Sequence, residues 1–250
     1  MLPGMNKSLP SRRKRAIRLA AVLPLAAIGA SLGASDAFAA TSAPPKATDL
    51  IAAVKKAMIA AKSVHFEVTS AVSGTNEHII ADAGTSTGRQ SIKSGKSTAD
   101  VLVTATDAYF DGNKSGLSTF FNMPAADIAK VGTKWVYIKA GTSQYKNFKD
   151  GIVISALPAS FLPTAAQAKT AKVLDGKGSG KPLYALKWTV TSSGTKIDET
   201  LDVDATGSDL PLDATGVSGK NHTLTTFSKW GETIKLTAPK SLIAFTELSS

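Results

Sequence analysis

The chain has 250 residues, of which 29 are Lys or Arg and 19 are Asp or Glu, so its formal net charge is +10. It contains no cysteine, which excludes disulfides, thiol nucleophiles, cysteine-bearing metal sites and lipidation through a cysteine. Hydrophobic residues make up 43% and charged residues 19%, a balance that excludes a disordered polymer. Aromatic residues are sparse at 6% while Gly, Ser and Thr are plentiful, which favours a hairpin-rich β domain over a helical bundle.

The first 39 residues have the pattern of an export signal. Six basic residues lie between Lys7 and Arg18, an apolar run follows over residues 19–32, and Ala37-Phe-Ala39 has the small-x-small pattern of a signal peptidase site. The apolar run is too short to span a membrane comfortably. We therefore predict a secretory signal peptide over residues 1–39, cleaved after Ala39, and a secreted or extracytoplasmic envelope location.

Removal of this signal leaves a mild charge. The remaining 211 residues carry 23 basic and 18 acidic side chains, a net charge of +5. The lysines are scattered, and aromatic residues do not alternate with them as in single-strand nucleic-acid binders. We therefore expect no nucleic-acid partner. An anionic membrane surface and an envelope protein are kept as candidate partners.

The clearest helical pattern follows directly. Residues 40–47 are expected to form a flexible N-terminal segment, and residues 48–250 a single domain. Thr48 or Asp49 can cap a helix that runs to about Lys62. Its apolar residues fall near one helical face: Leu50, Ile51, Val54, Met58 and Ile59.

Beyond Lys62 the apolar period changes from that of a helix to that of strands with one buried face. Val64, Phe66 and Val68 alternate with polar residues. A further run contains Val101 and Val103 and is expected to end at a turn at residues 111–112. Other strands are predicted over residues 77–83, 88–93, 134–140, 183–191, 196–203, 221–227 and 233–237. Short polar turns between them favour antiparallel pairing.

Two apolar segments interrupt the strands. Residues 123–130 predict a short helix with Pro124 in its first turn, and residues 151–168 predict short helical or irregular pieces that cover the sheet. Together these patterns indicate an α+β fold, in which a curved antiparallel β-sheet (half-barrel) has helices covering its concave face. The side chains of a curved sheet cannot fill its concavity alone, so the helices either pack it or leave a pocket.

Catalytic motifs are weak. His65, His78 and His222 lack metal-ligating spacing, and no G-x-S-x-G or phosphate-binding glycine pattern occurs. Ser193 and Lys196 match a serine–lysine pair, but Ser193 lies in a predicted turn instead of at the start of a buried helix. We therefore predict a protein that is not an enzyme and needs no metal or cofactor, with a hydrolase using Ser193 as a minor alternative. The small acidic group of Asp198, Glu199, Asp202 and Asp204 is interpreted as surface charge, with a weak calcium contact as the alternative.

Large apolar side chains remain in the connectors. Phe120, Phe121 and Met123 lie in one connector, and Leu157, Phe161 and Leu162 lie near prolines in another. Such side chains beside a curved sheet either plug its core or line a binding pocket. From the residues alone, we expect these side chains to fill the core of the sheet and not to line a pocket.

Several segments resemble a known family. They are Ser63-Val-His-Phe-Glu-Val68, Gly132-Thr-Lys-Trp-Val-Tyr137, Leu201-Asp-Val-Asp-Ala-Thr-Gly207 with Leu210-Pro211, Phe227-Ser-Lys-Trp-Gly231 and Thr237-Ala-Pro239. In these segments the chain resembles actinobacterial envelope proteins of the LppX/LprG type, which belong to the wider LolA-like group. The family's lipid-anchored cysteine is missing, because Leu32-Gly-Ala-Ser35 has serine in its place.

The resemblance implies a carrier with an apolar cavity between sheet and helices, holding a lipid, a lipoglycan or an acyl chain. Burial of each CH₂ contributes roughly 0.8 kcal/mol, so a long acyl chain needs no precise polar contact. The early helix would form part of the lid. The expected lining is Val54, Met58, Val64, Phe66, Val68, Val101, Val103, Phe120, Phe121, Met123, Leu157, Phe161 and Leu162. The alternative is an envelope sensor or interaction module of the same fold, with a filled core and a protein partner.

Overall fold

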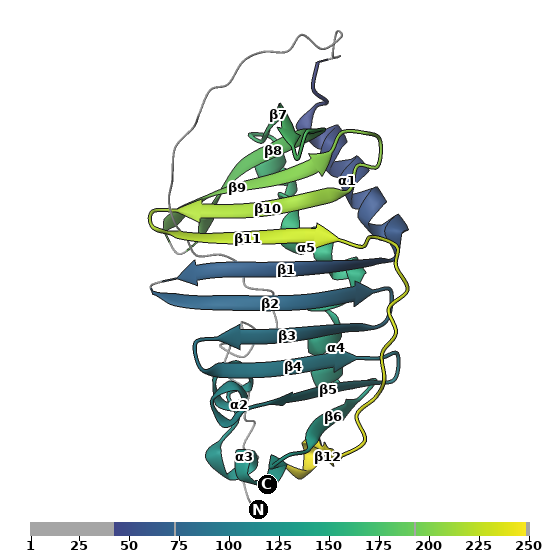
Figure 1. Ribbon diagram of the computed structural model, residues 1–250, viewed down its shortest axis with the longest axis vertical. Helices are drawn as coiled ribbons and strands as arrows, with labels where there is room; N and C mark the ends of the chain where they lie inside the picture. Colours follow the sequence, from purple (N-terminus) through teal and green to yellow (C-terminus); the bar gives the residue numbers. More distant parts are fainter. Residues whose placement is uncertain (1–42, 73, 193, 249–250) are drawn as a thin grey trace, which may run out of the picture.

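A computed structural model describes residues 43–72, 74–192 and 194–248 (Figure 1). The predicted signal peptide and the first part of the N-terminal segment lie outside these residues. The described chain forms a 12-stranded sheet in the order β12-β6-β5-β4-β3-β2-β1-β11-β10-β9-β8-β7. Neighbouring strands are antiparallel, except that β12 pairs with β6 in parallel.

The strands have the following bounds: β1 (Ser63–Val72), β2 (Thr75–Gly84), β3 (Gly88–Ser94), β4 (Ser97–Val103), β5 (Asp107–Gly112), β6 (Trp135–Lys139), β7 (Lys172–Gly178), β8 (Lys181–Ser192), β9 (Thr195–Asp204), β10 (Pro211–Ser218), β11 (Asn221–Ser228) and β12 (Leu242–Ala244). The α-helices are α1 (Ala47–Ala61), α2 (Lys114–Phe121), α3 (Ala125–Val131), α4 (Ser143–Lys149), α5 (Leu157–Phe161) and α6 (Ala165–Ala168). Two 3₁₀ turns, η2 (Ile154–Ala156) and η3 (Phe245–Glu247), complete the fold.

Helix α1 forms where the sequence predicts it, with two differences. It begins at Ala47 without a side-chain cap, so neither Thr48 nor Asp49 caps it. Its buried face consists of Leu50, Val54 and Met58, whereas Ile59, expected on that face, is 42% exposed. The helix ends because Lys62 adopts a left-handed conformation, with φ 66°, and its N–H donates to the carbonyl of Ile59.

The predicted run through Val101 and Val103 is in fact two strands, β4 and β5. The chain reverses between them in a turn where the Thr104 N–H donates to the Asp107 carbonyl at 2.8 Å. The Asp107 N–H in turn donates to Thr104 Oγ1 at 3.0 Å. The turn contains neither Gly nor Pro, so no breaker residue marks it. Residues 111–112, expected to form the turn, instead belong to β5.

Among the described residues, one predicted strand is absent, the other predicted strands are present, and five strands and helices were missed. The strand predicted over residues 233–237 is wrong, because the described chain there has no strand pairing and runs along one end of the sheet toward β12 (Figure 1). Strands β7, β10 and β12 and helices α2 and α4 were not predicted from the pattern of the residues. Asn113 caps the start of helix α2, because its side chain accepts from the Gly116 N–H at 2.7 Å.

The two predicted connectors agree with the structure. Helix α3 begins directly after Pro124, and residues 151–168 form η2, α5 and α6. Helices α1, α4 and α5 lie behind the sheet in Figure 1, on its inner face. The molecule therefore has the expected α+β fold, a curved antiparallel sheet with helices over its concave face.

Candidate functional site

The inner face of the central strands is apolar. Phe66 of β1 lies in register with Phe227 of β11 and with Ala81 of β2, and one step along the strands Val68 is in register with Ile79. All five side chains are buried. Because side chains alternate between the faces of a strand, this register places a continuous apolar surface beneath the helices.

Residues from α5 lie directly on this surface. The Phe161 ring is 6.2 Å from the Phe66 ring, centroid to centroid, and 4.9 Å from the Phe227 ring, both in edge-to-face geometry. Leu157 is fully buried, whereas Phe161 and Leu162 are half-buried at the border of the cluster. The cover over this part of the sheet thus consists of short pieces with incompletely buried side chains.

A second apolar cluster lies beneath α2 and α4. The Phe110 ring of β5 stacks on Phe148 of α4 at 5.3 Å and contacts Phe121 of α2 at 4.3 Å, centroid to centroid. Val101 and Val103 of β4 belong to this cluster. Its helices begin at capped N-termini, since Asn113 caps α2 and Thr142 caps α4.

The two clusters meet along a narrow boundary. Phe120 packs against the first cluster, to which Ile154 belongs. Phe121 packs against the second cluster, to which Ile152 belongs. At this boundary the chain passes very close to the sheet, because a Cβ on Gly88 would lie 2.9 Å from the Ile152 carbonyl oxygen. The backbone of residue 152 therefore separates the clusters on the β3 side.

The expected lining residues fall into both clusters. The first contains Val54, Met58, Val64, Phe66, Val68 and Leu157, with Phe120, Phe161 and Leu162 partly buried against it. The second contains Val101, Val103 and Met123, with Phe121 partly buried against it. These side chains pack on one another, and no bound ligand identifies a lining, so their assignment to a binding site stays a prediction.

One end of the inner face is polar. Glu199, Gly216, Thr223, Ser70 and Glu77 follow one another in register across β9, β10, β11, β1 and β2. Burial raises the pKa of Glu199 to about 7 and also raises the pKa of Glu77 above its ordinary value. The interpretation of Glu199 as surface charge was therefore wrong, because its carboxylate is half-buried, with Oε2 3.1 Å from where a Cβ on Gly216 would lie.

Charged side chains form a chain of contacts on the outer face. His65 Nδ1 lies 2.7 Å from Asp82 Oδ1, and Arg89 also contacts Asp82. Glu67 lies between two histidines, with Oε1 3.6 Å from His65 Nε2 and Oε2 3.5 Å from His78 Nε2. Burial alone would raise the pKa of Asp82, but the hydrogen bonds from His65 and Arg89 outweigh it and lower that pKa.

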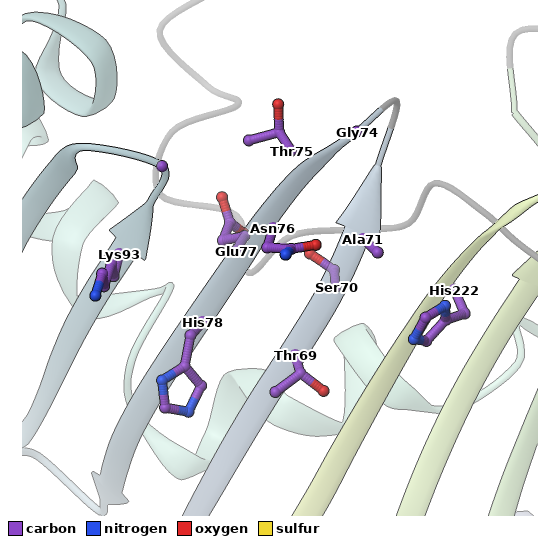
Figure 2. Close-up of a pocket in the computed structure, with 11 residues that line it drawn as sticks. Thr69, Ser70, Ala71, Gly74, Thr75, Asn76, Glu77, His78, Lys93 and His222 are labelled. Carbon is purple, nitrogen blue, oxygen red and sulfur yellow. The ribbon is translucent and has the colours of Figure 1, made fainter.

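A hollow of about 780 Å³, lined by small and polar residues, opens beside this chain of contacts, at the hairpin ends of β1, β2 and β3 (Figure 2). The side chains labelled in Figure 2 arise from the neighbouring strands β3, β2, β1 and β11 and from the turn between β1 and β2, with His222 contributed by β11. We call it the hairpin hollow; it is lined by Thr69, Ser70, Ala71, Gly74, Thr75, Asn76, Glu77, His78, Lys93, Gly95 and His222. This site was not predicted from the sequence, because its residues come from separate strands and share no motif.

Metal-ligand clusters and membrane-spanning helices are both missing from the described ranges. Within these ranges, no group of three or more His, Cys, Asp or Glu side chains could hold a metal ion. None of the described helices is long and apolar enough to cross a membrane. Ser193 lies outside the described residues, so the hydrolase alternative stays untested.

Comparisons with known proteins give no family assignment. No protein-family model matches the chain, and no curated protein matches it in sequence. Among solved structures, LprF from Mycobacterium bovis is similar at 14% identity, covering 78% of this chain and 98% of its own, with a TM-score of 0.49. Lipoprotein LppX from Mycobacterium tuberculosis is similar at 14% identity, covering 75% of this chain and 98% of its own, with a TM-score of 0.43.

An uncharacterized conserved protein from Thermus thermophilus is similar at 10% identity, covering 80% of this chain and 99% of its own, with a TM-score of 0.43. At these identities and TM-scores, none of the three identifies a ligand or an activity for this chain.

Proposed function

We propose that this protein is an extracytoplasmic, non-enzymatic carrier that holds the acyl chain of a lipid or similar amphiphile between its sheet and its helices. The observation that carries the proposal is the first apolar cluster, where the half-buried Phe161 ring contacts the buried rings of Phe66 and Phe227 and Leu162 is half-buried against the same cluster. The predicted export signal supports the extracytoplasmic location, and the family resemblance of the sequence supports the carrier function.

The proposed site lies in the first cluster because its cover is assembled from short segments. Helix α5 has five residues, and Leu162 directly after it has an extended backbone, with φ −107° and ψ 146°. Outward movement of residues 157–162 would free the space that Phe161 and Leu162 now occupy. An acyl chain entering that space gains roughly 0.8 kcal/mol for each buried CH₂, which offsets the cost of displacing these side chains.

The second cluster is proposed as the rigid part of the molecule. Its rings stack on one another, its helices are capped, and the backbone at residue 152 lies close against Gly88. Val101, Val103, Phe121 and Met123 would then support the site from beside it, although the sequence analysis placed them in its lining.

Native mass spectrometry after gentle purification tests the proposal, together with uptake of a long-chain fluorescent fatty acid by delipidated protein. We expect a lipid adduct and saturable uptake of one fatty acid per chain. Leu162→Ala should accelerate uptake, since it removes apolar contacts from the cover, whereas Leu174→Ala should not, since Leu174 is 46% exposed outside the cluster. A protein without adduct that takes up no fatty acid would overturn the carrier function.

The second candidate is an interaction module of the same fold with a filled core. The close ring contacts of both clusters favour it. It predicts that the purified chain retains a protein from the membrane fraction and carries no lipid. A retained partner together with absent fatty-acid uptake would select this candidate over the carrier.

A further inference from the structure

The hairpin hollow differs from the apolar clusters in position and in chemistry. Thr69, His78 and Lys93 alternate along their strands with buried inner residues, so they project from the outer face. Ser70 and Glu77, in contrast, belong to the polar row at the end of the inner face. The hollow therefore lies at the hairpin edge, where the outer face meets the end of the inner face (Figure 2).

The lining offers hydrogen-bonding groups of both kinds and contains no large apolar side chain. Hydroxyl groups come from Thr69, Ser70 and Thr75, and an amide group comes from Asn76. Lys93 donates only, the Glu77 carboxylate accepts only, and His78 and His222 each provide ring nitrogens. Ala71, Gly74 and Gly95 complete the lining and keep it open.

Several of these groups have no partner among the described residues. In the part of the chain that the structure describes, the side chains of Asn76, Glu77, Lys93 and His222 take part in no hydrogen bond or ion pair. On the outer face, Asn76 and His222 are both in register with Ala71, and Lys93 is in register with His78, whereas Glu77 is in register with Ser70 at the end of the inner face. The sheet thus holds unpaired donors and acceptors at fixed spacings around one hollow.

The charges of the hollow select against an ionic ligand. An anion attracted by Lys93 would also meet Glu77 in the lining and Glu67 beside His78. A cation attracted by Glu77 would meet Lys93. A neutral ligand with several hydroxyl groups can accept from Lys93 and Asn76 on the outer face, donate to Glu77 where the hollow reaches the hairpin edge, and place its ring against an imidazole.

We propose that the hairpin hollow binds a neutral polyhydroxylated group, a sugar or another polyol, presented either as a free saccharide or as the head group of a glycolipid. The hollow has a volume of about 780 Å³, room for more than one sugar ring. This site is separate from the proposed acyl site. Binding of a free saccharide therefore does not rest on the proposed carrier function, whereas binding of a glycolipid head group does.

Saturation-transfer NMR with maltose, gentiobiose and myo-inositol tests the free ligand class on the mature chain. We expect transfer to at least one of them, and Asn76→Ala and Lys93→Ala should each weaken binding about fivefold, the effect of one lost hydrogen bond. Asn147→Ala and Lys139→Ala, which alter exposed residues outside the hollow, serve as matched controls and should bind as the parent does.

Octyl maltoside below its micellar concentration, compared with octanoate, separates the two sources. Stronger binding of octyl maltoside than of maltose, lost in Lys93→Ala while fatty-acid uptake persists, assigns the hollow to a head group. Equal binding of maltose and octyl maltoside assigns it to a free saccharide. No binding of any polyol, equal binding in the lining variants, or tighter binding of inorganic phosphate would overturn the proposal, and fatty-acid uptake reports separately on the carrier function.

Discussion

At the scale of single residues, Gly88 determines how closely the chain after α4 can approach the sheet. A Cβ at this position would lie 2.9 Å from the carbonyl oxygens of both Asp82 and Ile152, and it would also meet the Ile152 side chain. Two of these obstacles are backbone atoms, which cannot rotate away. The boundary between the two apolar clusters therefore depends on the absence of a side chain at residue 88.

We predict that Gly88→Ala lowers the free energy of unfolding by about 1–3 kcal/mol, the usual cost of overpacking a well-packed site. Urea unfolding followed by tryptophan fluorescence measures it. Gly178→Ala is the matched control, because its Cβ would meet only the flexible end of Leu183. A Gly88 variant as stable as the Gly178 variant would contradict the close approach of residue 152.

Burial of Glu199 makes the free energy of unfolding depend on pH, in a direction that follows from the raised pKa of this residue. Burial raises the pKa of Glu199 from 4.5 to about 7, so between these values the folded protein retains a proton that the unfolded chain has released. The free energy of unfolding should consequently fall as pH rises from about 4.5 to about 7, and this contribution stays constant above that range.

We predict that Glu199→Gln removes this contribution, leaving the variant more stable than the parent at about pH 8 by about 2 kcal/mol. The two proteins should differ little at about pH 4.5, where the Glu199 carboxyl is protonated in the folded state. Urea unfolding across this range measures the difference, with the exposed Glu232→Gln as control. A constant difference between variant and parent at all pH values would refute a buried, titrating Glu199.

At the scale of elements, a helix or strand could be predicted where its residues follow a regular apolar period. Helix α1 has a complete apolar period over several turns, and its bounds were predicted within two residues. Strand β1 has several apolar alternations, and its start was predicted within one residue, although the strand continues to Val72. The β4–β5 turn depends on hydrogen bonds of Thr104, and α2 on the Asn113 cap. Neither residue is distinctive by itself, which explains why both features were missed.

The candidate site was predictable to a different extent. The apolar residues of α1, β1 and α5 were identified because burial requires their hydrophobic character. Their division into two clusters depends on where residues 120–121 and 152–154 cross the sheet, which no local pattern encodes. The hairpin hollow depends on the register of four strands and was invisible to motif analysis.

The end of α1 offers a test at this scale. Lys62 has a φ of 66°, a left-handed conformation that costs a residue with a side chain more than it costs glycine. We predict that Lys62→Gly raises the free energy of unfolding by about 0.5–1 kcal/mol. Lys56→Gly, within the same helix, should instead lower it by about 1 kcal/mol. Urea unfolding of both variants decides the matter, since a destabilised Lys62→Gly would exclude the left-handed C-cap.

At the scale of the whole molecule, the sheet is continuous because its first and last large hairpins pair with each other. Phe66 of β1 is in register with Phe227 of β11, which joins the half built on β1–β6 to the half built on β7–β11. One face of this long sheet is covered, and its two described edges are β7 and β12. Exposed edges invite pairing with another chain, so the way each edge is covered affects whether the protein stays a single chain.

The β12 edge is held mainly by two side chains. Strand β12 has three residues and pairs in parallel with β6, while Ile243 and Leu248 are buried in the second cluster. Substitution of each by alanine removes buried apolar contacts and leaves a cavity, at a cost of about 2–5 kcal/mol for a residue of this kind. Without these anchors β12 should detach and leave β6 as an unpaired edge.

We therefore predict that the double variant Ile243→Ala/Leu248→Ala unfolds at a much lower urea concentration than the parent and elutes as larger species in size-exclusion chromatography at high protein concentration. Leu242→Ala is the matched control, because Leu242 lies on the same strand but is 37% exposed, and its loss should change stability by less than about 0.5 kcal/mol. If the double variant unfolded and eluted like Leu242→Ala, the C-terminal segment would not secure this edge, and the second cluster could not be the rigid support on which the proposed carrier depends.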